Sequence, residues 1–168
     1  EAEDAIEIID ENGNLLTHSA SMTKAGVDRS GPNGLIASGL GDTENQIKLI
    51  NDSLFTLTLL DVGGKVSNYG ICWLDNENIL CCIRNNTSTI GQSIYKVNIH
   101  TGIRTLIKQG CETKSYLSVS VSSDRQKLLV GTSEYTLNSA NKTIESHRGI
   151  YLMNIDGSDE QEINLPPF

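Results

Sequence analysis

The chain has 168 residues, 38% of them hydrophobic, which is enough for one sizeable core and more than a disordered chain carries. Its formal net charge is -8 at pH 7, and no two lysine or arginine residues are adjacent, so we expect no nucleic-acid partner. No stretch reaches the ~20 consecutive apolar residues of a membrane-spanning helix, so no membrane span is expected.

The N-terminal third carries the first copies of a repeated pattern, in which an apolar run is followed by a polar corner and a glycine. These copies occupy residues 6–13 and 57–64, and two more follow at residues 94–102 and 150–157. Between the first two, residues 22–33 are expected to form a loop carrying one strand. Residues 35–40 and 46–50 are expected to form two further strands.

From Tyr69 onward the strand and turn signals become regular. The first unit is predicted to have strands at residues 69–74, 79–83, 93–99 and 103–107, with turns at 75–78 and 100–102. The second is predicted to have strands at residues 116–121, 127–130, 150–155 and 160–165, with a turn at 122–125 and a long loop at 131–148. Residues 156–160 are expected to form a hairpin corner whose charged side chains face solvent.

Residues 118–130, with the sequence SVSVSSDRQKLLV, resemble the S-P-D-G turn of TolB-type, WD40-like β-propeller repeats. Ser123 replaces the usual proline of that turn and Arg125 the usual glycine. Residues 150–157 resemble the strand and corner of the same repeat, and residues 73–80 with 94–99 give a looser copy. The resemblance implies an all-β fold of four-stranded antiparallel blades.

On this interpretation the chain is a single propeller-like domain. Residues 1–18 would form half a blade, 19–68 an irregular blade, and 69–110 and 111–168 one blade each. A closed propeller typically has about four to eight blades, so we expect a partial propeller. Because an open end would expose unpaired strand edges, we expect a homo-oligomer or completion by a missing segment.

The four cysteines do not indicate a metal site. If Leu74 pairs with Ile79 across the turn, then Cys72 lies opposite Cys81, close to disulfide range. Two reduced core thiols are the favoured interpretation, because cysteine commonly behaves as a small buried hydrophobe. Cys81 and Cys82 are adjacent in a strand and must face opposite sides, so we expect neither a metal nor a cofactor.

Candidate binding residues lie in the long loop at 131–148, because long loops on rigid sheets often carry binding. A surface insertion without function is the competing interpretation. The corresponding loop of the preceding unit could share a rim with it. The candidate residues are Arg84, Asn85, Glu134, Tyr135, Glu145, His147 and Arg148.

No catalytic motif indicates an enzyme: the chain has no G-x-S-x-G elbow, no H-E-x-x-H and no P-loop. The leading hypothesis is a non-catalytic binding or scaffolding module that recognises protein partners through its loops. One alternative is the propeller portion of a larger prolyl-oligopeptidase-like hydrolase. Another is an extracytoplasmic ligand- or glycan-binding sensor. The sequence gives no compartment.

Overall fold

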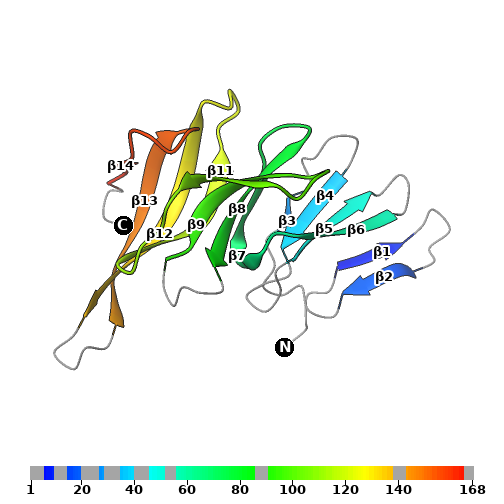
Figure 1. Ribbon diagram of the computed structural model, residues 1–168, viewed down its shortest axis with the longest axis horizontal. Coiled ribbons are helices and arrows are strands. Elements are labelled where there is room, and N and C mark those ends of the chain that lie inside the picture. Colours follow the sequence, from blue (N-terminus) through cyan, green and yellow to red (C-terminus); the bar gives the residue numbers. More distant parts are fainter. Residues whose placement is uncertain are drawn as a thin grey trace.

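The computed structural model is built from β-strands throughout the residues it describes (Figure 1). The structure describes residues 6–9, 15–19, 27–28, 35–39, 46–51, 56–85, 91–137 and 143–164. Within these ranges there is no helix, and hence no apolar helix of the length that a bilayer requires. The predicted all-β class is confirmed.

The N-terminal strands form a hairpin and a four-stranded sheet. The hairpin pairs β1 (Ile6–Ile9) with β2 (Leu15–Ser19). The sheet is an antiparallel meander of β3 (Val27–Asp28), β4 (Leu35–Gly39), β5 (Gln46–Asn51) and β6 (Thr56–Asp61). The strands predicted at 35–40 and 46–50 are therefore present within one residue at each end. The corner predicted at residues 10–13 lies outside the described residues.

The remaining strands form two antiparallel meanders that meet in one sheet. The first meander contains β7 (Gly64–Trp73), β8 (Asn78–Asn85), β9 (Ser93–Asn98) and β10 (Arg104–Lys108). The second contains β11 (Lys114–Val121), β12 (Lys127–Leu137), β13 (Thr143–Asn154) and β14 (Gln161–Glu162). The first strands of the two meanders, β7 and β11, run parallel and pair at Tyr69 and Ser118. Among the described strands the series stays open and does not close into a ring.

Strands β7–β9 of the first meander are buried on both faces, whereas β10 at its edge is mostly exposed. The two faces are formed by alternate residues, since successive side chains of a strand point to opposite sides. One face packs against β5 and β6 in a cluster that includes Ile47, Leu60, Trp73 and Cys81. The other face packs against β11–β13 through Cys72, Leu80, Cys82, Ile94, Tyr116, Val130 and Met153. This double burial explains the unbroken apolar run of β8, which does not alternate with polar residues.

The predicted turns are present and are held by short polar side chains. Asp75 Oδ1 accepts hydrogen bonds from the backbone N–H groups of Glu77 and Asn78, both at 2.8 Å. Asn98 Oδ1 accepts from the N–H of His100 at 3.1 Å, and the following glycine, Gly102, has a φ of 71°. Asx turns of this kind are the reason that these residues end strands.

The predicted pairing of Cys72 with Cys81 is wrong by one residue. The register pairs Cys72 with Leu80, because Trp73 and not Leu74 lies opposite Ile79. The N–H groups of Leu74 and Asp75 are instead used in the turn, where both donate to the Asn78 carbonyl. Cys72 and Cys81 therefore belong to opposite faces of the sheet.

None of the four cysteines forms a disulfide, and Cys72, Cys81 and Cys82 are buried thiols. The prediction that Cys81 and Cys82 face opposite sides is confirmed, because Cys81 lies in one core cluster and Cys82 in the other.

The predicted long loop at 131–148 is also wrong. Strand β12 continues to Leu137 and β13 begins at Thr143, so most of the segment is a hairpin that projects beyond the body of the sheet (Figure 1). Its residues include few large apolar side chains, so the alternation that marks a half-buried strand is missing. Hydrogen bonds between the backbones of β12 and β13 hold the two strands extended, although their sequence lacks this alternation.

Candidate functional site

A group of charged and aromatic side chains lies on the inner face of the C-terminal meander, beyond the apolar core. Register places Lys114 of β11 opposite Glu134 of β12, and Glu134 opposite His147 of β13. Residues that are directly opposite in an antiparallel pair point to the same side of the sheet. We call this group the Lys114 cluster. It comprises Lys108, Lys114, Tyr116, Glu134, Tyr151 and Glu160.

Lys114 is the centre of the cluster. Its Nζ lies 2.8 Å from Glu160 Oε1 and 3.5 Å from Glu134 Oε1. The same atom lies 3.6 Å from the centre of the Tyr151 ring, a cation–π contact. The Tyr151 hydroxyl in turn donates to Glu134 Oε1 at 2.9 Å, so the strands β11, β12 and β13 are linked through one ammonium group.

Glu160 connects the corner after β13 to this network. Its carboxylate accepts from the Tyr116 hydroxyl at 3.2 Å and lies 3.0 Å from Lys108 Nζ. The expectation that the charged side chains of this corner face solvent is wrong for Glu160, whose side chain is 17% exposed. It is half-buried because the corner folds back over β10 and β11, where Lys108 also donates to the Gly157 carbonyl at 3.1 Å.

The charges in the cluster stabilise one another. Burial alone would raise the pKa of Glu160, but hydrogen bonds from Lys114 and Lys108 outweigh burial and hold the pKa below its ordinary value. Burial alone would lower the pKa of Lys114, but the Glu160 hydrogen bond and charge raise it overall. Burial raises the pKa of Tyr116, and the nearby Glu160 charge raises it further.

At neutral pH Glu160 is therefore ionised, Lys114 is protonated and the Tyr116 phenol is neutral. None of these groups is placed to exchange a proton near pH 7, which a general acid or base must do. The chemistry that the cluster performs is electrostatic: it fixes the C-terminal corner on the sheet.

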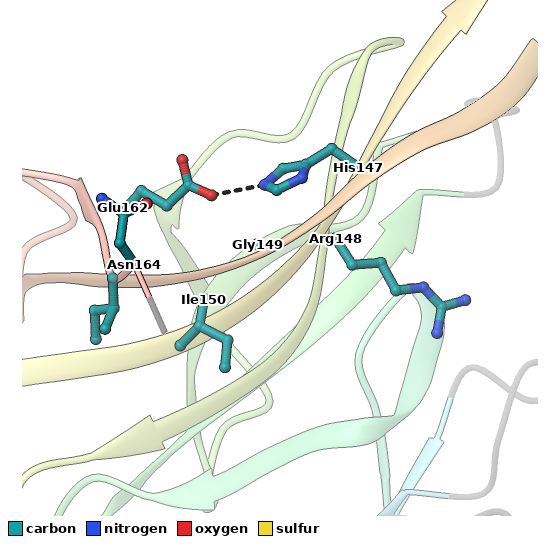
Figure 2. Close-up of a pocket in the computed structure, with 7 residues that line it drawn as sticks. His147, Arg148, Gly149, Ile150, Glu162 and Asn164 are labelled. Carbon is teal, nitrogen blue, oxygen red and sulfur yellow. Dashed lines mark hydrogen bonds and ion pairs between the residues drawn. The ribbon is translucent and has the colours of Figure 1, made fainter. Parts of the chain in front are cut away.

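The candidate residues of the hairpin are divided between the two faces of the sheet. Glu134 belongs to the Lys114 cluster, and His147 Nε2 lies 2.6 Å from Glu162 Oε1. Figure 2 shows His147 turned toward Glu162 while Arg148 points away from it. Tyr135 lies opposite Glu145 in the register, one step farther along the hairpin.

The other two candidates, Arg84 and Asn85, lie at the end of β8. Asn85 Nδ2 donates to the Tyr95 hydroxyl at 3.3 Å. With its amide oriented to donate to the Tyr116 carbonyl, Gln92 accepts a hydrogen bond from Arg84 at 3.3 Å. Among the residues that the structure describes, Arg84 Nε and Asn85 Oδ1 are buried without a hydrogen-bond partner. No described contact joins Arg84 or Asn85 to the hairpin candidates.

A groove of about 400 Å³ lies beside β13 where β14 ends (Figure 2). Its floor includes Gly149, where a Cβ atom would lie 2.5 Å from the Tyr151 ring. Glycine thus allows the Tyr151 ring to fold across the strand toward Lys114. The groove is lined by His147, Arg148, Gly149, Ile150, Glu162, Ile163 and Asn164.

Four aliphatic side chains are partly exposed together on the opposite, outer face of the same sheet. Leu129 lies opposite Leu152 in the register, and the Ile163 N–H donates to the Ile150 carbonyl at 2.7 Å. Their side chains are 45% exposed at Leu129, 37% at Leu152, and 36% at both Ile150 and Ile163. We call these four residues the outer patch. Sequence reasoning missed it, because both faces of these strands read as apolar and only the stacking order leaves one face uncovered.

The described residues contain no group of three or more histidine, cysteine, aspartate or glutamate side chains that could hold a metal ion. In the comparison with protein families, residues 18–154 match the model described as Domain of unknown function (DUF4652). The search of curated proteins found no match.

Proposed function

The chain belongs to the DUF4652 family of domains of unknown function, and we propose that it is a non-catalytic protein-binding module of propeller-like, stacked β-sheets. The observation that carries this proposal is the outer patch. Contiguous exposed aliphatic side chains on a rigid sheet are typical of protein interaction surfaces.

The propeller-like arrangement is supported by the way the meanders stack. Each meander of the eight-stranded sheet contains four antiparallel strands, and the two are joined through their first strands, which run parallel. The apolar clusters lie between successive meanders, so each layer covers the face of the next. In such a series the last layer has one face left for a partner, and that face carries the outer patch.

The charge states of the Lys114 cluster support binding over catalysis. Each charged group of the cluster is paired with a group of opposite charge or with a phenol hydroxyl. These contacts keep Lys114 protonated and Glu160 ionised. A catalytic site usually shows the reverse, with pKa values shifted toward neutrality.

Point variants of the outer patch test the proposal. Deleting residues 131–148 would remove about half of each of the strands β12 and β13, so a substitution such as Leu152→Glu is the sharper choice. The matched control is Ile103→Glu, which adds the same charge at a side chain that is 67% exposed outside the patch. We expect the native chain and the control to capture a protein that Leu152→Glu does not capture. That protein is then purified, and its binding to all three chains is measured. Identical capture by all three chains would contradict the proposal.

The groove beside β13 supports a second candidate, a sensor of small ligands. Its volume of about 400 Å³ falls within the range of small-molecule sites, and it combines Ile150 with the polar side chains of His147, Arg148 and Glu162. A thermal-shift screen against sugars and short peptides tests this, because a ligand that binds the native state raises the midpoint of unfolding. A shift that Glu162→Ala abolishes would favour the sensor, and the absence of any shift would count against it.

A further inference from the structure

Lys65 in β7 and Arg84 in β8 form a cross-strand pair of like charge. The register places Lys65 directly opposite Arg84, and the next pair along, Val66 and Ile83, belongs to the core cluster against β5 and β6. Because successive side chains of a strand alternate between faces, Lys65 and Arg84 both lie on the other face, which is turned toward β11–β13. Directly opposite residues of an antiparallel pair have Cβ atoms about 4.5–5.5 Å apart, so the two cationic side chains are neighbours.

This pair is unfavourable for the chain by itself, because like charges directly opposite each other destabilise a sheet. No ion pair between the residues that the structure describes involves Lys65 or Arg84. The carboxylates of Glu134 and Glu160 on the facing meander are engaged by Lys114 instead. The Lys65 side chain is exposed, so an anion in solution has access to it.

The guanidinium group of Arg84 also has a donor that the described part of the chain does not use. One of its nitrogens donates to the Gln92 side chain at 3.3 Å, and Gln92 in turn donates to the Tyr116 carbonyl. Because the Gln92 amide is neutral, it orients the guanidinium group without compensating its charge. Arg84 Nε is buried and has no hydrogen-bond partner among the described residues. A guanidinium group presents its N–H donors in a planar fork that matches the oxygens of a carboxylate or a phosphate.

We infer that Lys65 and Arg84 form a binding site for a doubly charged oxyanion, and that its ligand is a phosphate group. Two adjacent cations favour a ligand with two negative charges, and a phosphate group carries about −1.5 to −2 charges at pH 7. Arg84 donates to the phosphate oxygens through its fork, and Lys65 contributes a point charge on a flexible stem. The site includes neither the outer patch nor the groove beside β13, so it is independent of the proposed function.

Isothermal titration calorimetry of the whole chain with inorganic phosphate at low ionic strength tests the site. We expect a dissociation constant below ~1 mM, weakened at least about tenfold by Lys65→Gln and by Arg84→Gln, because each substitution removes a charge-assisted contact. Lys96→Gln is the control: it removes the same charge from β9, where the register places Lys96 opposite Leu80 and not beside the pair. Lys96→Gln should bind phosphate like the native chain. Tighter binding of phosphoserine than of inorganic phosphate would identify the ligand as a phosphorylated molecule, and the reverse would identify it as the free ion.

Thermal unfolding gives a second measurement, which a purely structural role of Lys65 would not reproduce. Removing one cation of a like-charged pair relieves repulsion, so without phosphate Lys65→Gln should unfold at a midpoint at least as high as that of the native chain. Phosphate should raise the midpoint of the native chain but not that of Lys65→Gln. A chloride salt at equal ionic strength controls for simple screening of the pair. Because Lys65 is exposed, this variant keeps the test decisive even if circular dichroism shows that Arg84→Gln does not fold.

Three results would overturn this inference. Absence of any binding at ~10 mM phosphate would exclude a site of useful strength. Equal binding by the native chain and by Lys65→Gln would place the anion elsewhere on the molecule. Acetate bound as tightly as phosphate would show that the pair accepts a single negative charge. The protein-binding proposal would survive each of these results, because Leu152→Glu tests it without altering this pair.

Discussion

Arg125 adopts a backbone conformation that L-residues rarely take, with a φ of 57° in the turn between β11 and β12. Asp124 and Ser122 hold this turn, because Asp124 Oδ1 accepts from the Gln126 N–H and from the Ser122 hydroxyl. We expect Arg125→Gly to raise the free energy of unfolding by about 1 kcal/mol, since glycine tolerates this conformation. Urea unfolding measures the change. Arg125→Ala removes the same charge but keeps the strained conformation, so an equal gain with alanine would refute the backbone explanation.

Glu160 is expected to contribute stability that depends on pH. Lys114 and Lys108 hold its pKa below the ordinary value of 4.5 in the folded chain, so folding favours the ionised carboxylate. The contribution is fully present above pH 4.5 and is lost as the pH falls through the lower folded pKa. Glu160→Gln should therefore destabilise the chain by ~2 kcal/mol at pH 7, and the difference from the native chain should shrink toward pH 3.

The control for Glu160 is Glu162→Gln. The Glu162 side chain is 39% exposed and contacts His147, which is 48% exposed, so this pair lies in water. An exposed pair of this kind contributes about 0–1 kcal/mol. A larger loss for Glu162→Gln than for Glu160→Gln in thermal unfolding at pH 7 would show that the Lys114 cluster does not hold the corner.

At the scale of the elements, the corners at Gly102 and Gly157 differ in how closely a neighbouring strand packs against them. Both Gly102 and Gly157 have a positive φ, of 71° and 84°. A Cβ atom at Gly157 would lie 2.4 Å from the Ile107 carbonyl oxygen, whereas at Gly102 the nearest atom would be 3.3 Å away on Leu60. We expect Gly102→Ala to lower stability by about 1 kcal/mol and Gly157→Ala by more than 2 kcal/mol. Chemical denaturation of both variants tests this order, which equal losses would contradict.

The strands and turns of the fold could be predicted where local chemistry determines them. The corner at Asp75 follows from an Asx turn, and the strands beside it from unbroken β-rich runs. The register could not be predicted to one residue, because the turn uses the N–H groups of both Leu74 and Asp75 and so shifts Cys72 away from Cys81. The hairpin of β12 and β13 was missed because pairing continues there without an apolar face.

The candidate site was only partly predictable for a related reason. Glu134 and His147 were found because they lie in a segment that stands out in length. Lys114, Tyr116 and Glu160 were missed, because a contact such as the one between Tyr116 and Glu160 joins positions 44 residues apart. No local spacing encodes such a contact; it depends on the order in which the strands stack.

At the scale of the whole molecule, the layer formed by strands β7–β9 is buried on both faces. It carries Cys72, Cys81 and Cys82, all buried, whereas Cys111 is exposed. Burial raises the pKa of Cys81, and likewise that of Cys82. The hydrogen bond with Thr113 lowers the pKa of Cys111. Buried, protonated thiols do not react, because the thiolate is the nucleophile.

The thiols therefore report on whether the layers separate. In the native chain one thiol should react rapidly with a disulfide reagent, and Cys111→Ser should remove that reaction. The other three should react only as fast as the chain unfolds, because both faces of their sheet must be uncovered first. Met153→Ala creates a cavity in the core cluster that contains Cys72 and Cys82. This substitution should therefore speed the labelling of the buried thiols. Rapid labelling of two or more thiols in the folded native chain would mean that the middle layer is not enclosed on both faces, and the stacked arrangement would have to be abandoned.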